Sequence, residues 1–297
     1  MQSNPNLAAT AAERSAVRSA VRSAARSDLL YVSNSGNGTV TVYDDRTHSL
    51  VATLTGFQRP KGECVDSSGD VFITDRLAED VVEYAHGGTA PIAVISDSGF
   101  QDYACSVDLT TGDLAVANSY QRDGNAGAIA IYSHASGSPQ LYHIDRVPNP
   151  QTCAYDDRGD LLVASDYRRE GKQFVAFAYL PKKHRRFIHL DLSIRGLQAG
   201  GTYNVQWDGR YWALLYDNNV LRFRILNDGH ALMKGTVYLN ANSEGESRFW
   251  IFNRELVAAQ PSSVLYWKYP AGGNSIASIT DGLEQPYGVA VSRASKH

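Results

Sequence analysis

Polar and aromatic side chains recur at matching positions along this sequence, in a pattern that could form a binding site. One set lies five residues before the end of a predicted strand and comprises Lys61, Tyr103, Gln151, Tyr203, Arg248 and Tyr287. A second set ends the strand that follows and comprises Asn34, Asp75, Asn118, Asp166, Asp217 and Gln260. Such groups can hydrogen-bond to, stack on and pair with a small anionic or sugar-like ligand. The alternative is that the Asn and Asp side chains only cap strand-to-strand loops.

Two segments beside the second set are longer and more polar than their counterparts elsewhere in the chain, residues 118–127 and 166–172. They add four candidate ligand-binding residues, Tyr120, Arg122, Tyr167 and Arg168. Loops at one end of a rigid β scaffold are a common place for binding groups. The sequence therefore predicts a polar and aromatic cup on one face of the molecule.

Motifs for covalent and phosphate chemistry are missing. The sequence has no Gly-x-Ser-x-Gly elbow and no glycine-rich phosphate loop before a helical segment. The aspartates that end the predicted first strands each precede a turn, and they are Asp66, Asp108, Asp156 and Asp208. We expect these carboxylates to cap turns rather than to catalyse.

The elements that would position these side chains form an internal repeat. "RPKGECVDSSGDVFITD" (59–75) and "NPQTCAYDDRGDLLVASD" (149–166) both read as strand, tight turn and strand. The pattern returns roughly every 40 to 50 residues, a period that suits a unit of four short strands. Several runs are apolar on both faces, as expected for sheets packed between other sheets.

The two ends of the repeat array complete one another. "LLYVSN" (29–34) is a second strand without a first, and "QPYGVAVS" (285–292) is a first strand without a unit. Pairing them closes a ring and removes unpaired edges. We therefore predict an all-β fold, a six-bladed β-propeller of four-stranded antiparallel blades over residues 28–297, preceded by a flexible Arg/Ala/Ser-rich arm over residues 1–27.

Composition narrows the class of protein. The net charge of −3 argues against nucleic-acid binding. No apolar run approaches the roughly 18 residues of a membrane-spanning helix, and the arm lacks the continuous apolar region of an intact secretory signal. We expect a monomer whose partner is a small molecule or a protein at the channel face.

Three cysteines are present, and each lies on the first strand of a repeat: Cys64, Cys105 and Cys153. Cys105 and Cys153 are equivalent in their repeats, whereas Cys64 lies one residue later. We expect small buried residues at these positions. The alternative that the repeat suggests is a Cys105–Cys153 bridge between neighbouring units.

Two stretches resemble known propeller repeats. "LLYVSNSGNGTVTVYD" resembles YncE-like and lactonase-like repeats, and "RPKGECVDSSGDVFITD" and "QPYGVAVS" resemble the NHL repeat with its Pro-x-Gly strand. The resemblance covers residues 28–292. It implies a bacterial propeller and, because relatives are often exported, a periplasmic or extracellular location. The wider superfamily includes enzymes and pure binding modules, so the fold alone does not assign the function.

The resemblance also implies an enzymatic alternative, a metal-dependent lactonase, hydrolase or lyase of the SMP-30 type. Such relatives hold a divalent ion in the channel through Glu, Asn and Asp oxygens. In this chain the corresponding set would be Glu63, Asn118, Asp166 and Asp217, with Ca²⁺ or Zn²⁺ as the cofactor. However, Glu63 is followed by Cys64 and Val65 rather than by the Pro and Trp of the lactonase signature. We therefore favour a non-enzymatic binding protein without a cofactor.

Overall fold

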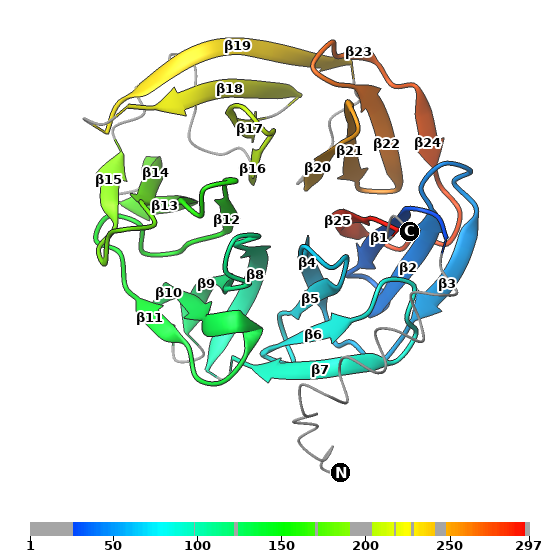
Figure 1. Cartoon of the computed structure of the whole chain (residues 1–297), viewed down its shortest axis with the longest axis horizontal. Helices are drawn as coiled ribbons and strands as arrows, with labels where there is room; N and C mark the ends of the chain where they lie inside the picture. Colours follow the sequence, from blue (N-terminus) through cyan, green and yellow to red (C-terminus); the bar gives the residue numbers. More distant parts are fainter. Residues whose placement is uncertain are drawn as a thin grey trace.

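The computed structural model describes residues 26–97, 99–121, 124–169, 172–190, 204–216, 218–226, 229–240 and 248–294, without the side chains of residues 102, 166–169 and 172–174. The strands form six small antiparallel sheets arranged in a ring around a central axis (Figure 1). The predicted six-bladed propeller is confirmed. No helix in the described ranges is long and apolar enough to span a membrane.

Each blade places its first strand nearest the axis and its last strand on the outside (Figure 1). Blade 1 consists of β25 (Pro286–Ser292), β1 (Leu29–Asn34), β2 (Thr39–Asp44) and β3 (Leu50–Leu54). Blade 2 consists of β4 (Pro60–Val65), β5 (Val71–Asp75), β6 (Asp80–Tyr84) and β7 (Pro91–Ser96). Blade 3 consists of β8 (Phe100–Val107), β9 (Leu114–Gln121), β10 (Ala126–Tyr132) and β11 (Gln140–Tyr142), with a short 3-10 turn η1 (Ser133–Ala135).

The second half of the ring follows the same plan. Blade 4 consists of β12 (Thr152–Tyr155), β13 (Leu161–Arg169), β14 (Lys172–Leu180) and β15 (Ile188–Leu190). Blade 5 consists of β16 (Asn204–Trp207), β17 (Trp212–Tyr216), β18 (Asn219–Ile225) and β19 (Ala231–Asn240), to which β23 (Gly273–Asn274) adds a short parallel strand. Blade 6 consists of β20 (Phe249–Phe252), β21 (Glu255–Gln260), β22 (Ser263–Lys268) and β24 (Ala277–Ile279).

The ring closes as the two half-units predict. β25 pairs antiparallel with β1, with Leu29 opposite Ser292 and Val32 opposite Val289. All seven residues of β25 are buried. The first and last strands of the chain therefore belong to one sheet.

Apolar clusters join each blade to its neighbour. Leu162 and Phe177 of blade 4, for example, pack with Leu214 and Phe223 of blade 5 in one buried cluster. Sheets that are covered on both faces need apolar residues on both faces. This requirement explains the near-continuous apolar strands in the sequence.

Aspartates cap the turns after the innermost strands, as predicted. Asp66 Oδ1 accepts hydrogen bonds from the backbone N–H groups of Ser68 and Asp70, both at 2.8 Å. Asp156 Oδ1 accepts equivalent bonds from Arg158 and Asp160. Each carboxylate accepts hydrogen bonds within its own turn. An aspartate therefore recurs wherever the repeat needs this turn.

The Pro-x-Gly motif has a packing role near the axis. A Cβ built on Gly62 would lie 2.7 Å from Ala104 Cα and 2.8 Å from the Tyr103 carbonyl oxygen, both in the next innermost strand. A Cβ on Gly288 would overlap Glu63 Oε2 and the Lys61 carbonyl oxygen. Glycine at these positions lets two innermost strands approach closely.

We expect Gly288→Ala to lower the free energy of unfolding by about 3 kcal/mol or more, because the backbone carbonyl that it meets cannot rotate away. Gly56→Ala is the control, since its Cβ would meet nothing within 4 Å and only its φ of +99° opposes alanine. Chemical denaturation of both variants measures the difference. Equal losses in the two variants would contradict the packing role.

The cysteine expectation needs correction. Cys64 and Cys105 form a disulfide with their Cα atoms 5.6 Å apart, so the alternative Cys105–Cys153 bridge is wrong. Cys153 is a buried free thiol, as expected.

The reason for the correct pairing is the alternation of side chains along a strand. Cys105 Sγ points back to the Phe72 carbonyl of blade 2, and Cys153 Sγ points back to the Ala115 carbonyl of blade 3. Two cysteines at the same repeat position thus face the same way around the ring and cannot meet. Cys64 lies one residue out of phase, so it faces forward to Cys105.

Candidate functional site

A cavity of about 1110 Å³ lies on the axis of the ring. Its walls come from the innermost strands of all six blades, and its lining continues onto the turns that follow them, including Ser68, Asp157, Arg210, Arg254 and Arg293. The mouth is therefore on the face where the innermost strands end. This is the face opposite to the predicted cup.

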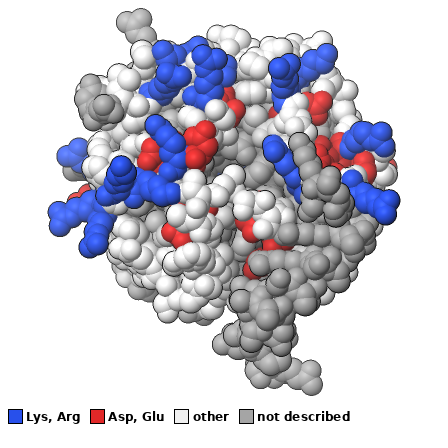
Figure 2. Space-filling model, viewed as in Figure 1, with Lys and Arg blue, Asp and Glu red and all other residues white. Residues whose placement is uncertain are grey.

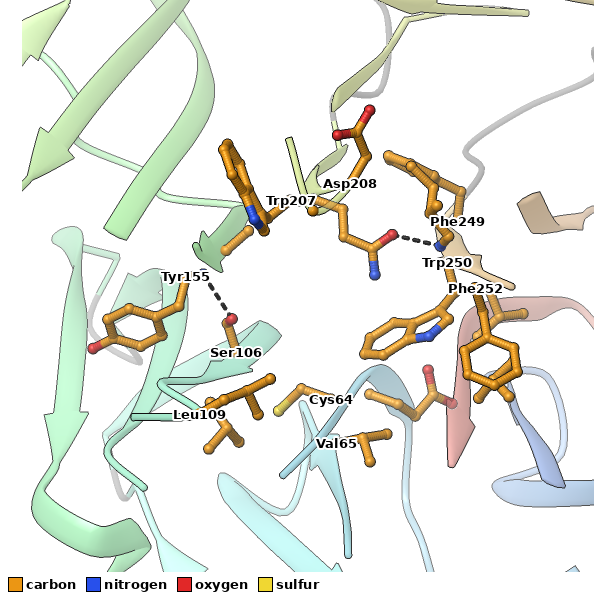
Figure 3. Close-up of a pocket in the computed structure, with 18 of the residues that line it drawn as sticks. Cys64, Val65, Ser106, Leu109, Tyr155, Trp207, Asp208, Phe249, Trp250 and Phe252 are labelled. Atoms are coloured by element: carbon orange, nitrogen blue, oxygen red, sulfur yellow. Dashed lines mark hydrogen bonds between the residues drawn. The ribbon is translucent and has the colours of Figure 1, made fainter. Parts of the chain in front are cut away.

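Aromatic side chains line much of the wall, and they are Tyr155, Trp207, Phe249, Trp250, Phe252 and Tyr269. Figure 3 shows Trp207 and Trp250 on different sides of the pocket, with Cys64, Val65 and Leu109 along its lower edge. Trp207 is held edge-on against Trp212, with ring centroids 5.3 Å apart. The wall therefore offers several aromatic surfaces, and packing against Trp212 orients one of them, Trp207.

Hydrogen bonds between neighbouring innermost strands fix the shape of this wall. Gln206 Oε1 accepts a bond of 2.5 Å from the backbone N–H of Ile251, which ties blade 5 to blade 6 (Figure 3). Ser106 Oγ accepts a bond of 2.9 Å from the backbone N–H of Tyr155, which ties blade 3 to blade 4 (Figure 3). The cavity is pre-formed by the scaffold.

Arg248 forms the inner end of the cavity. Its side chain is 4 % exposed. Nη2 donates to the Gln151 carbonyl oxygen at 2.7 Å and to the Tyr103 carbonyl oxygen at 3.5 Å, and Nη1 donates to Asn204 Oδ1 at 3.4 Å. One guanidinium from blade 6 thus reaches blades 3, 4 and 5 across the axis.

Behind Arg248 the structure brings together several residues of the predicted cup. Lys61 Nζ lies 3.4 Å from the centroid of the Tyr287 ring and 5.8 Å from that of Tyr103. The two rings meet edge to face at 6.3 Å, and Arg248 Cζ lies 5.4 Å from the Tyr287 centroid. This cluster lies outside the cavity lining, which includes only Glu63 and Arg248 of the predicted site residues. Gln151 joins the cluster through its carbonyl oxygen.

Sequence reasoning missed Arg76 beside this cluster. Its guanidinium lies 4.7 Å from the Tyr103 ring and donates to Tyr103 Oη at 3.1 Å and to Gln101 Oε1. The signal was its place directly after Asp75, at the end of a second strand. It also missed the cavity aromatics, although "QW" (206–207) and "FWIF" (249–252) stand at the ends of innermost strands.

The remaining predicted binding residues lie elsewhere or outside the described part. Tyr120 is 39 % exposed on β9 and pairs with Ala126 of β10. Tyr167 and Arg168 lie on β13, opposite Phe174 and Gln173, without described side chains. Tyr203 and Arg122 lie outside the described residues. Their part in binding stays a prediction.

Two residues of the candidate metal set are described, and each has an intramolecular partner. Ser33 Oγ donates to Glu63 Oε1, and Asn118 Nδ2 donates to Asp97 Oδ2 at 2.5 Å. Asp217 and the side chain of Asp166 lie outside the described part. Across the ranges described, no group of three or more His, Cys, Asp or Glu side chains could hold a metal ion. The metal set stays a prediction that depends on the undescribed groups.

Two residues of the second set accept hydrogen bonds from loop backbone, and a role for them in ligand binding stays a prediction. Asp75 accepts from the backbone N–H groups of Gln58 and Arg59 at 2.6 and 2.7 Å. Asn34 Oδ1 accepts from the Glu284 N–H at 3.0 Å.

Glu63 is expected to make stability depend on pH. Burial raises the pKa of its carboxyl from 4.5 to about 8, and its Oε2 has no partner among the described residues. Between those pH values the unfolded chain releases the proton and the folded chain keeps it, so the free energy of unfolding falls as pH rises. One pKa unit corresponds to about 1.4 kcal/mol, so the loss is several kcal/mol.

We expect Glu63→Gln to flatten this dependence between pH 5 and pH 8 and to stabilise the protein at the higher pH. Urea denaturation at both pH values measures the effect, with the exposed Glu284→Gln as the control. A slope that Glu63→Gln leaves unchanged would show that another group titrates.

Comparison with solved structures agrees with the fold. The chain is similar to a chain in the crystal structure of a nidogen/laminin complex, with 13 % identity and a TM-score of 0.65 over 91 % of this chain and 100 % of that one. It is also similar to a functionally unknown protein from Desulfotomaculum acetoxidans DSM 771, with 11 % identity and a TM-score of 0.61 over 91 % and 100 % of the two chains. A protein of unknown function from Bacteroides caccae has 12 % identity and a TM-score of 0.62 over 90 % and 99 %. At such identities the likeness shows the fold alone.

No protein-family model matches the sequence, and no curated protein is detectably similar to it.

Proposed function

We propose that this protein is a non-enzymatic propeller that binds a small molecule in its axial cavity. The observation that carries the proposal is the cavity itself, which six rigid strands enclose and aromatic residues line. Its volume of about 1110 Å³ suits a ligand of drug or cofactor size. Polar atoms without partners at this site, Glu63 Oε2, Trp207 Nε1 and Arg248 Nε, are the kind of groups that a ligand satisfies.

We also propose that the chain is related to NHL-like or YncE-like propellers and is exported. The Pro-x-Gly strands at Gly62 and Gly288 support descent from NHL-like or YncE-like repeats, because the same glycine serves the same close approach in two blades. The Cys64–Cys105 disulfide supports export to an oxidising compartment.

A ligand screen tests the proposal. Soluble small molecules at saturating concentration are expected to raise the melting temperature of the protein, since a ligand at 100 times its Kd adds about 2.7 kcal/mol to stability. The shift should disappear in Trp250→Ala, which removes part of the cavity wall, and should persist in Tyr238→Ala, an exposed residue of the outer strand β19.

Ligands that stabilise Trp250→Ala as much as the original protein would place the binding site elsewhere. Hydrolysis of a lactone panel that depends on added Ca²⁺ or Zn²⁺ would replace the proposal with the enzymatic alternative.

A further inference from the structure

The inner end of the cavity carries the buried guanidinium of Arg248, on which the Glu63 carboxyl of the same lining acts electrostatically without forming an ion pair. Arg248 is 4 % exposed, and its three hydrogen-bond acceptors are neutral oxygens of Tyr103, Gln151 and Asn204. None of the ion pairs among the described residues includes Arg248. A buried guanidinium with no carboxylate within ion-pairing distance is costly, so a site of this kind favours an incoming anion.

Two unsatisfied donors belong to the same lining. Arg248 Nε–H and Trp207 Nε1–H are buried and have no partner in the described part of the chain. Both groups can only donate a hydrogen bond. The ligand atoms that satisfy them must be acceptors, and a carboxylate, sulfonate or phosphate supplies several.

The rim of the mouth is also basic on the side of blade 5. Three guanidinium carbons surround the ring of Tyr211, with Arg222 at 4.7 Å, Arg224 at 5.1 Å and Arg210 at 5.2 Å from its centroid. Asp208 pairs with Arg222 at 2.8 Å. Figure 2 shows basic side chains over the upper, left and right parts of the ring, with acidic side chains among them. Such a rim attracts anions toward the mouth.

Two acidic groups of the rim are occupied in their own turns, beside the exposed Asp157. Asp66 and Asp156 accept backbone hydrogen bonds within their turns, and Asp156 also pairs with Arg158. Between the basic rim and Arg248 the wall is aromatic, with Trp207 and Trp250 on different sides (Figure 3). Flat apolar groups pack well between such side chains.

We propose that the ligand is an organic anion with a planar apolar body, held with its anionic group at Arg248 and its body against Trp207 and Trp250. This inference rests on the proposed function and specifies its ligand class. A neutral glycan would need many paired donors and acceptors, whereas the unsatisfied groups of this lining are two N–H donors beside a cation and one carboxyl oxygen, Glu63 Oε2.

Two fluorescent probes with the same aromatic body test the assignment. One is 8-anilino-1-naphthalenesulfonate, and the other is the neutral N-phenyl-1-naphthylamine, which lacks the sulfonate. We expect the anionic probe to bind at one site per chain and at least tenfold more tightly than the neutral probe, and to weaken as salt concentration rises.

Variants then locate the anion. Arg248→Met should weaken the anionic probe roughly 10- to 100-fold and leave the neutral probe unchanged, which corresponds to losing one charge-assisted contact. Trp207→Phe removes the N–H together with the pyrrole part of the indole, so it should weaken both probes through lost packing and the anionic probe by a further factor of roughly 3- to 10-fold. Arg46→Met is the control, because this exposed arginine of the β2–β3 turn lies outside the lining.

The outcomes separate the two proposals. Equal binding of both probes that Trp250→Ala abolishes would overturn the anion assignment and leave the cavity as a binding site. Absence of saturable binding by either probe to the folded protein would count against both. If Arg248→Met does not fold cooperatively, Trp207→Phe decides the assignment, and an unchanged ratio of the two affinities would overturn it.

Discussion

Deleting residues 286–297 is expected to abolish the folded state. The deletion removes β25, whose seven residues are buried, and exposes the whole edge of β1. Val289 and Val291 also leave the cluster that joins blade 6 to blade 1. Each buried valine contributes about 1.5–3 kcal/mol, and a whole domain is stable by only about 5–15 kcal/mol.

The measurement is solubility after expression and the presence of a cooperative thermal transition. A chain that ends at Ala294 is the control, because it keeps the complete strand. Co-expression of a separate peptide covering residues 285–294 should restore soluble protein by supplying the missing strand. A soluble, cooperatively unfolding protein without β25 and without the peptide would show that blade 1 does not depend on its innermost strand.

Loss of the Cys64–Cys105 bridge is expected to have the second large effect. The bridge spans 41 residues, and closing a loop of that length in the unfolded chain accounts for about 4 kcal/mol. The double variant Cys64→Ala/Cys105→Ala should therefore unfold at a temperature lower by roughly 10 °C. Calorimetry without reductant measures the difference, and the original protein with reductant should approach the variant.

A thiol count supplies the control. In denaturant without reductant, one thiol per chain should react, and with reductant all three. Cys153→Ala should keep the bridge and abolish the single reactive thiol. Three reactive thiols before reduction would contradict the bridge itself.

The architecture was predictable because local signals repeat. Each turn after an innermost strand carries its own capping aspartate, as Asp66 and Asp156 show, and these contacts span only a few residues. The half-units at 29–34 and 285–292 then determine the closure, which the β1–β25 pairing confirms. Local chemistry repeated at a regular period is visible in a single sequence.

The site was less predictable because its residues contact one another across the axis, between blades that lie far apart in the sequence. Arg248 closes one end of the channel. Two of its three hydrogen-bond partners, Tyr103 and Gln151, lie about 100 residues or more away in the chain. Lys61, Tyr103 and Tyr287 lie together in the structure, but nothing in their residue types shows that they pack behind the cavity, and their part in binding stays a prediction. The Cys64–Cys105 pairing was not predicted because Cys64 is offset by one residue from the repeat position that Cys105 and Cys153 share.

The antiparallel pairing of Leu29 with Ser292 places the start of β1 and the end of β25 side by side, and Arg293 and Ala294 line the mouth of the cavity. A purification tag or fused protein attached just beyond either strand would therefore lie at the mouth of the cavity and compete with ligand for space. The same neighbourhood makes these positions useful, because a dye attached there would sense occupancy directly. We expect tagged protein to bind ligand with a lower association rate than untagged protein, while the free energy of unfolding stays the same.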